Sequence, residues 1–181
     1  MKKRSFLMNS LKITTIAAVF FLLSACITTT GEINGNAFYL DNNFTVSLMN
    51  GDWTVLRQQK GVVNYQYYEN TAYQISFSHK KSNGLIGVHS FVMSEVGQAR
   101  SLEVHADSIA SEFGGMKLSQ RMIKVDGIDA VELLLSGNKM AKLILLKKGK
   151  MGFLLAYTNT PAYFDQSLSE FDKFIATFKT L

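Results

Sequence analysis

The residue of this chain whose side chain is best suited to take part in a chemical reaction is its single cysteine, Cys26. It ends the run Leu23-Ser24-Ala25-Cys26, in which small residues precede a thiol. An apolar stretch, 13–23, comes before the thiol, and it follows the basic residues Lys2, Lys3, Arg4 and Lys12. The stretch is shorter than the roughly 20 residues that cross about 30 Å of hydrocarbon. A charged start, a short apolar middle and small residues before a cut are typical of a cleaved export signal.

This pattern resembles a bacterial lipoprotein precursor with Leu23-Ser24-Ala25-Cys26 as its lipobox. The resemblance implies that residues 1–25 are removed as a signal peptide. It also implies that Cys26 receives a diacylglyceryl group and then, on its freed amine, a further acyl chain such as palmitate. Two or more chains anchor a protein stably, at about 0.8 kcal/mol per buried methylene. The alternatives are an ordinary secretory peptide with a chance cysteine, or a buried core cysteine.

The residue after the cysteine bears on the destination. An Asp there would favour retention in the inner membrane, and this chain has Ile27. We therefore expect a cell-envelope protein that is lipid-anchored, faces the periplasm and lies at the outer membrane rather than the inner one.

Patterns for catalysis or metal binding are sparse in the rest of the sequence. His79, His89 and His105 lack the tight spacing of metal-ligand pairs. We expect surface or edge histidines, although His79 and His89 could meet on neighbouring strands, and His105 should be a packed or capping residue. No G-x-S-x-G elbow or phosphate loop is present, and Asp126 and Asp129 flank a turn. The sequence predicts no catalytic residue, cofactor or metal, and hence no enzyme.

Lysines form the first candidate surface for a partner. Five of them gather on one predicted hairpin: Lys139, Lys142, Lys147, Lys148 and Lys150. The candidates among these, Lys147, Lys148 and Lys150, could bind anionic lipid headgroups or an acidic protein. They could equally protect a strand edge from aggregation.

Tyrosines form the second candidate surface, with Tyr65 and Tyr67 on one face of a predicted strand and Tyr68 on the other. Exposed tyrosines could form a recognition patch. The alternative is that their rings are half-buried and serve the strand alone.

The charge and the cysteine content argue against a nucleic-acid-binding protein and against a disulfide-stabilised domain. The whole chain has 19 Lys and Arg against 14 Asp and Glu, and a pI of about 9.3. Four of the basic residues lie in the signal, which leaves 15 against 14 in the mature chain. No nucleic-acid partner is therefore predicted. A single cysteine permits no internal disulfide, so stability must come from an apolar core.

The secondary-structure pattern predicts one α+β domain. Residues 26–37 are polar and turn-rich and predict a flexible tether, followed by the domain at 38–181. Strands are expected at 44–48, 53–56, 62–69, 73–77, 86–93, 118–125, 130–135, 140–146 and 152–157, with Asn70 in a turn. Ser101 should cap a helix with an apolar face ending at Phe113. A second helix carries the stripe Leu168, Phe171, Phe174, Ile175 and Phe178.

Several segments each match a motif of one known family. They are the strand at 44–48 with the turn and tryptophan at 50–53, the turn at 126–130, and the ending 152–158, Phe164 and 171–178. In these segments the chain resembles the Mog1/PsbP-like family, although Met49-Asn50 replaces a proline of its first turn. The resemblance implies a mostly antiparallel sheet sandwiched by helices, an α-β-α sandwich. It implies no catalytic residue, because each motif serves folding.

Three functions remain open at this point. The favoured one is a non-catalytic lipoprotein that binds or helps assemble an unidentified envelope protein. The alternative is a small-ligand carrier or sensor in the periplasm, which needs an open apolar cleft. An undetected hydrolase would need a cleft with converging polar groups.

Overall fold

The computed structural model describes residues 31–40, 42–61 and 68–181, with side chains described outside 57–72. Cys26, Tyr65 and Tyr67 lie outside the described residues. The predictions made for these three residues therefore stay predictions.

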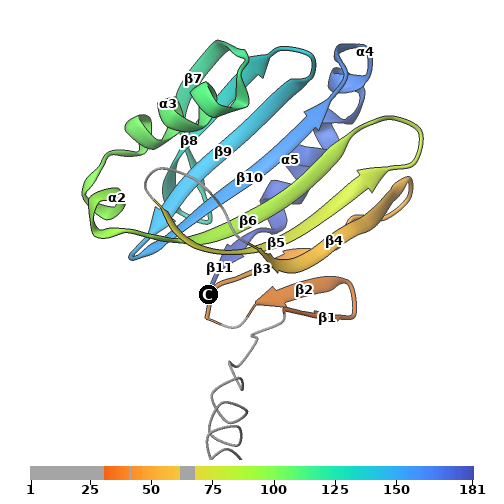
Figure 1. The fold of residues 1–181 in the computed structure, drawn as a ribbon. Coiled ribbons are helices and arrows are strands. Elements are labelled where there is room, and N and C mark those ends of the chain that lie inside the picture. Colours follow the sequence, from red (N-terminus) through yellow and green to blue (C-terminus); the bar gives the residue numbers. More distant parts are fainter. Residues whose placement is uncertain (1–30, 41, 62–67) are drawn as a thin grey trace, which may run out of the picture.

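A seven-stranded antiparallel sheet forms the centre of the molecule (Figure 1). In spatial order its strands are β4 (Trp53–Gly61), β5 (Tyr68–His79), β6 (Leu85–Met93), β10 (Met151–Asn159), β9 (Met140–Lys148), β8 (Ile128–Ser136) and β7 (Met116–Val125). Tight turns with positive φ join several of them, as at Asp126-Gly127 and Gly149. Such turns suit two-residue hairpins because their twist matches that of the strands.

A second, smaller sheet lies at one end of the molecule. Its order is β1 (Glu32–Asn34), β2 (Ala37–Leu40), β3 (Phe44–Ser47) and β11 (Lys179–Thr180). Strand β1 falls inside the predicted tether, so that prediction is wrong for residues 32–34. Gly35, at a φ of 59°, turns the chain so that Glu32–Asn34 pairs with β2.

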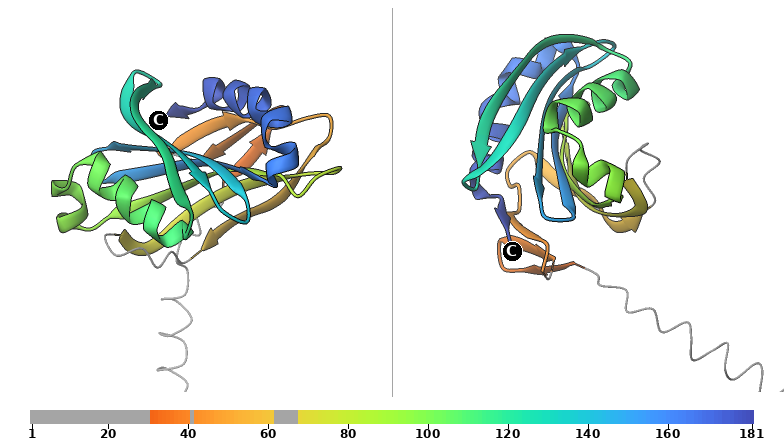
Figure 2. Two further views of the ribbon diagram at one scale, coloured as in Figure 1. Left: turned by 90° about the horizontal axis from the view of Figure 1, so that it is seen from above. Right: turned by 90° about the vertical axis from the view of Figure 1, so that its left-hand side faces the viewer.

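Helices cover both faces of the large sheet (Figure 2). The helices α2 (Glu95–Ala99) and α3 (Leu102–Phe113) cover one face. On the other face lie α4 (Pro161–Phe164), the 3₁₀ turn η1 (Asp165–Ser167), α5 (Leu168–Thr177) and the small sheet. The predicted α+β class and α-β-α sandwich are confirmed.

Each face of the large sheet has its own apolar core. The core under α5 includes Phe77, Phe153 and Phe171, and the core under α3 includes Ile109 and Leu133. Strand β9 contributes to both, as its run of apolar residues predicts.

Besides β1, the structure also differs from the sequence predictions at Asn70 and at α2. Asn70 lies within β5, not in a turn, where the pairing of β5 with β6 shifts register between Tyr68 and Ala72. The other exception is α2, a helix of five residues that the sequence pattern does not reveal. No helix in the described residues is long and apolar enough to cross a membrane.

Candidate functional site

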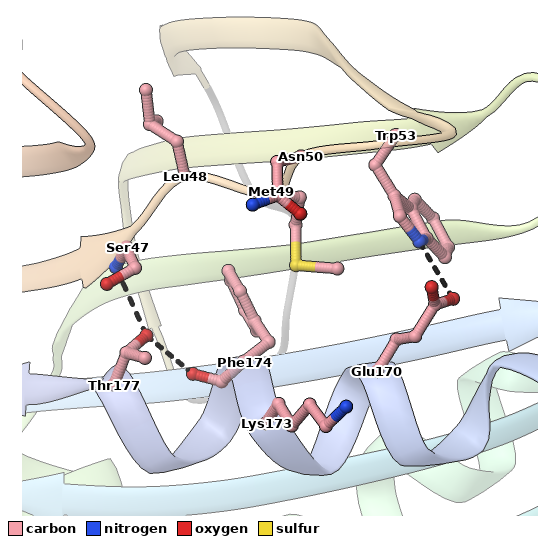
Figure 3. Close-up of a pocket in the computed structure, with 9 residues that line it drawn as sticks. All are labelled: Ser47, Leu48, Met49, Asn50, Trp53, Glu170, Lys173, Phe174 and Thr177. Atoms are coloured by element: carbon pink, nitrogen blue, oxygen red, sulfur yellow. Dashed lines mark hydrogen bonds between the residues drawn. The ribbon is translucent and has the colours of Figure 1, made fainter.

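A cleft of about 280 Å³ lies between the β3–β4 connection and α5 (Figure 3). It is lined by Ser47, Leu48, Met49, Asn50, Trp53, Glu170, Lys173, Phe174 and Thr177. Two stretches more than a hundred residues apart in sequence form its walls. The cleft therefore exists only once the small sheet and α5 have packed together.

Hydrogen bonds fix the two walls to each other. The buried Trp53 donates from Nε1 to Glu170 Oε2 at 3.0 Å, and the Ser47 amide donates to Thr177 Oγ1 at 3.1 Å. The Thr177 hydroxyl donates in turn to the Phe174 carbonyl at 2.8 Å. These bonds join the β3–β4 connection to α5 at both ends of the cleft, so the cleft keeps its shape.

The turn that leads to Trp53 is held from outside. Gly51 has a φ of 68°, which a side chain would disfavour. Lys81 Nζ lies 2.6 Å from Asp52 Oδ2, and this hydrogen bond lowers the pKa of the exposed Asp52 carboxyl below its usual value. The Lys80 ammonium donates to the Gly51 carbonyl at 3.0 Å.

Apolar groups make the interior of the cleft and polar groups its rim. Leu48 and Met49 are half-buried, and Figure 3 shows the Met49 thioether directed between Phe174 and Trp53. The exposed Lys173 ammonium makes no hydrogen bond or ion pair within the described residues. An apolar interior with an unpaired cation at its edge suits an apolar side chain followed by a polar or anionic group.

A second hollow, of about 310 Å³, lies on the same face of the large sheet as α2 and α3. Gln74, Ser76 and His89 line it together with the backbone of Gly87. A Cβ at Gly87 would lie 2.9 Å from the Ile75 carbonyl, so glycine is needed there for strand packing. This requirement accounts for Gly87 without any ligand.

The two strand histidines do not meet. His79 pairs with Trp53, whereas His89 pairs with Gln74, which lies five positions before His79 in β5. Within the described residues, no group of three or more histidine, cysteine or acidic side chains could hold a metal ion. The hypothesis that His79 and His89 share a site is wrong.

His79 instead forms a pair with a serine. Ser82 Oγ lies 3.0 Å from His79 Nδ1, and it accepts from the Gly84 amide and from Asn159 Nδ2, both at 3.2 Å. With both lone pairs engaged, the hydroxyl has only its proton left to give to His79. The pair therefore holds the β5–β6 turn against the end of β10.

His105 is a packed and capping residue, as predicted. It is 1% exposed, and its Nε2 lies 2.7 Å from the Gly97 carbonyl near the end of α2. Burial lowers the pKa of His105; the bond to Gly97 acts in the opposite direction, and the nearby Lys147 and Arg100 lower it further. The imidazole is therefore held neutral.

The predicted lysine surface divides into separate roles. Lys147 is half-buried and donates to the Gln98 carbonyl at 3.1 Å and the Arg100 carbonyl at 2.5 Å, so it caps α2. Lys148 lies on the opposite face of β9 and reaches Thr180 Oγ1 at 3.3 Å. Lys150 is exposed at the turn.

The other two lysines of the hairpin lie elsewhere. Lys142 forms ion pairs with Glu132 at 3.2 Å and Asp172 at 2.7 Å, which join β9 to β8 and α5. Lys139 lies at the far end of β9 and donates to the Asn83 carbonyl at 3.4 Å. The five lysines do not form one patch.

Sequence reasoning missed the cleft. Trp53 is the only tryptophan, and Lys173 stands on the polar side of a clearly amphipathic helix, so each could have drawn attention. Their neighbourhood could not be foreseen, because the Trp53–Glu170 bond joins residues 117 positions apart.

Comparison with solved structures gives the fold a name. The chain is similar to the solution structure of cyanobacterial PsbP (CyanoP) from Synechocystis sp. PCC 6803, at 9% identity and a TM-score of 0.56, with 84% of this chain and 94% of that one covered. It is also similar to a crystal structure from Bacteroides thetaiotaomicron VPI-5482, at 14% identity and a TM-score of 0.53, with 82% of this chain and 49% of that one covered. No family model and no curated protein matches the sequence. The domain therefore has a PsbP-like fold, and identities this low transfer the fold alone.

Proposed function

We propose that this chain is a lipid-anchored protein of a bacterial cell envelope that binds an envelope protein and catalyses no reaction. The observation that carries the proposal is the cleft of Figure 3. Anchor side chains at protein interfaces fill preformed pockets of this kind, surrounded by a polar rim. The lipobox supports the anchor, and the anchor would confine the cleft to one membrane surface.

The open rim of the cleft favours a protein partner over a carried ligand. Small-molecule sites are typically about 300–1,000 Å³ and enclose most of the ligand. The volume of about 280 Å³ is shared with the open rim, so it suits one large side chain. Confinement to a membrane raises the effective concentration of neighbours, so a single anchor side chain can suffice.

Photocrosslinking in cells tests partner binding. A benzoyl-phenylalanine in place of Lys173, at the rim, should crosslink one defined envelope protein. The same residue in place of Lys124, on the far edge strand β7, should not. If the charge introduced by Met49→Lys abolishes the crosslink, the result supports binding in the cleft. If position 124 gives the same product, or if Met49→Lys leaves the crosslink unchanged, the proposal is overturned.

The anchor has its own test. Cys26→Ser should leave an uncleaved precursor or a soluble product, because no thiol remains to receive the diacylglyceryl group. The measurement is membrane fractionation with mass spectrometry of the mature chain. If the Cys26→Ser protein matures and fractionates like the wild type, the lipoprotein hypothesis is wrong.

A further inference from the structure

We propose that one end of the sandwich docks on an anionic phospholipid leaflet and so fixes the orientation of the domain. The proposal rests on the lipid anchor proposed above. The docking end, here called the basal surface, consists of the exposed residues Tyr39, Lys148, Lys150 and Leu181.

The length of the chain between the anchor and the domain limits the distance to the membrane. The paired strand β1 begins at Glu32, and Gly31 precedes it. Gly31 is five residues after Cys26, and a chain spans at most about 3.6 Å per residue, so the two Cα atoms are at most about 18 Å apart. The start of β1 therefore stays close to the headgroups whatever path the intervening residues take.

Strand pairing places the other strands of the small sheet close to the start of β1, and so close to the headgroups. Glu32 pairs with Tyr39, Tyr39 with Thr45, and Thr45 with Lys179, so these four residues form one row. Three strand spacings amount to about 14 Å. Lys148 then bonds to Thr180 in the last strand, which brings the β9–β10 turn to the same end. Figure 1 and the right-hand view of Figure 2 both show this end beside the C-terminus.

The side chains of the basal surface suit a phospholipid interface. Tyr39 is 39% exposed and Leu181 53%, so two large apolar groups face outward at this end. Aromatic residues such as Tyr39 favour the headgroup level of a membrane. The exposed ammonium groups of Lys150 and of Lys148, which also donates to Thr180 Oγ1 and to the Leu181 carbonyl at 3.4 Å, are attracted to anionic lipids.

The described part of this end contains few acidic groups. Among the described residues of the small sheet and the β7–β8 turn, Asp126 is paired with Lys179 at 3.1 Å and Glu32 is the other acid. The helices α2 and α3 are more acidic. They carry one basic residue, Arg100 at the end of α2, and the acids Glu95, Glu103 and Glu112, besides Asp107, which is paired with Lys117 at 2.6 Å. An anionic leaflet therefore attracts the basal surface and repels the α2–α3 face.

Fluorescence quenching on the lipidated protein tests the orientation. Once Cys26 is acylated, a cysteine introduced by Leu181→Cys or Asn138→Cys is the only free thiol for a fluorophore. Position 138 is at the opposite end of the nine-residue β9, about 30 Å from its tip. The protein is reconstituted in phosphatidylcholine vesicles with or without phosphatidylglycerol, and headgroup-spin-labelled lipid is the quencher.

We expect stronger quenching at position 181 than at 138 when phosphatidylglycerol is present. Each lysine near an anionic surface changes binding roughly five-fold, so the double change Lys148→Gln and Lys150→Gln should lower the docked-to-undocked ratio roughly 25-fold. The control Lys139→Gln, at the far end of β9, should leave it unchanged. Equal quenching at both positions, or no effect of the double change, overturns the docking while leaving the anchor intact. A mature chain without lipid overturns both.

Discussion

His105 and Lys147 show how single side chains decide the shape of the helical layer. The five residues of α2 are too few for a helix to be stable alone. Its terminal carbonyls are satisfied by His105 Nε2 at Gly97 and by the Lys147 ammonium at Gln98 and Arg100. A cation at a helix C-terminus also complements the helix dipole. Lys147 is therefore part of the fold, and Lys148 and Lys150 remain as the outward-facing candidates.

His105 alone should make the free energy of unfolding depend on pH. Its pKa in the folded chain lies below the usual 6.5, because burial and the neighbouring cations disfavour the imidazolium. Below pH 6.5 the unfolded chain takes up a proton that the folded chain does not, so stability falls on acidification. His105→Gln can still donate to Gly97 and should remove this slope, whereas His79→Gln should keep it. Urea unfolding on either side of pH 6.5 measures both variants; equal slopes in wild type and His105→Gln would contradict the assignment.

Among the elements, α5 covers the core on one face of the large sheet with Phe171 and Phe174. Phe171 is fully buried, with its ring centroid 5.7 Å from Tyr157 and 6.4 Å from Phe174. Burial raises the pKa of the Tyr157 hydroxyl, which donates to the Phe164 carbonyl at 2.7 Å. The aromatic rings thus connect β10 to α4 and α5.

Removing one ring of this set should be costly. Phe171→Ala should lower the free energy of unfolding by about 3–5 kcal/mol, because a buried ring leaves a cavity. That is comparable with the whole stability of about 5–15 kcal/mol of a typical domain. Lys173→Ala, on the exposed side of the same helix, should change it by less than about 0.5 kcal/mol. Thermal melting compares the two, and an unchanged midpoint for Phe171→Ala would show that the helix is peripheral.

Long elements with a clear period could be predicted from the sequence, and short ones could not. The α3 and α5 patterns predict both helices, although Phe178 lies just after α5 with extended backbone and is still buried. Strands β1 and β11 have three and two residues and exist only because β2 and β3 offer them partners. The cleft was hidden for the same reason, since tertiary contacts create it.

For the molecule as a whole, the question is how the small sheet is joined to the large one. Asp126, in the β7–β8 turn at a φ of 52°, accepts from the Thr180 amide at 2.9 Å and its hydroxyl at 3.0 Å. Lys179 Nζ lies 3.1 Å from the other carboxylate oxygen. Strand β11 is therefore bound to the large sheet through this carboxylate and through Lys148 of β9, and to β3 through its backbone.

This carboxylate should make the joint sensitive to acid. Burial raises the pKa of Asp126, but the bonds from Thr180 and Lys179 outweigh it, so the pKa lies below the usual 3.8. The stabilisation is complete above 3.8 and is lost as the pH falls through the lower folded value. Asparagine tolerates positive φ, so Asp126→Asn should keep the turn while costing about 1–2 kcal/mol at neutral pH and removing this part of the acid dependence. Asp129→Asn, whose exposed pair with Lys124 contributes little, is the matched control.

Hydrogen exchange of the Thr180 and Leu181 amides reports on the joint itself. These amides should exchange faster in Asp126→Asn alone, and equal rates in both variants would show that the backbone pairing with β3 suffices.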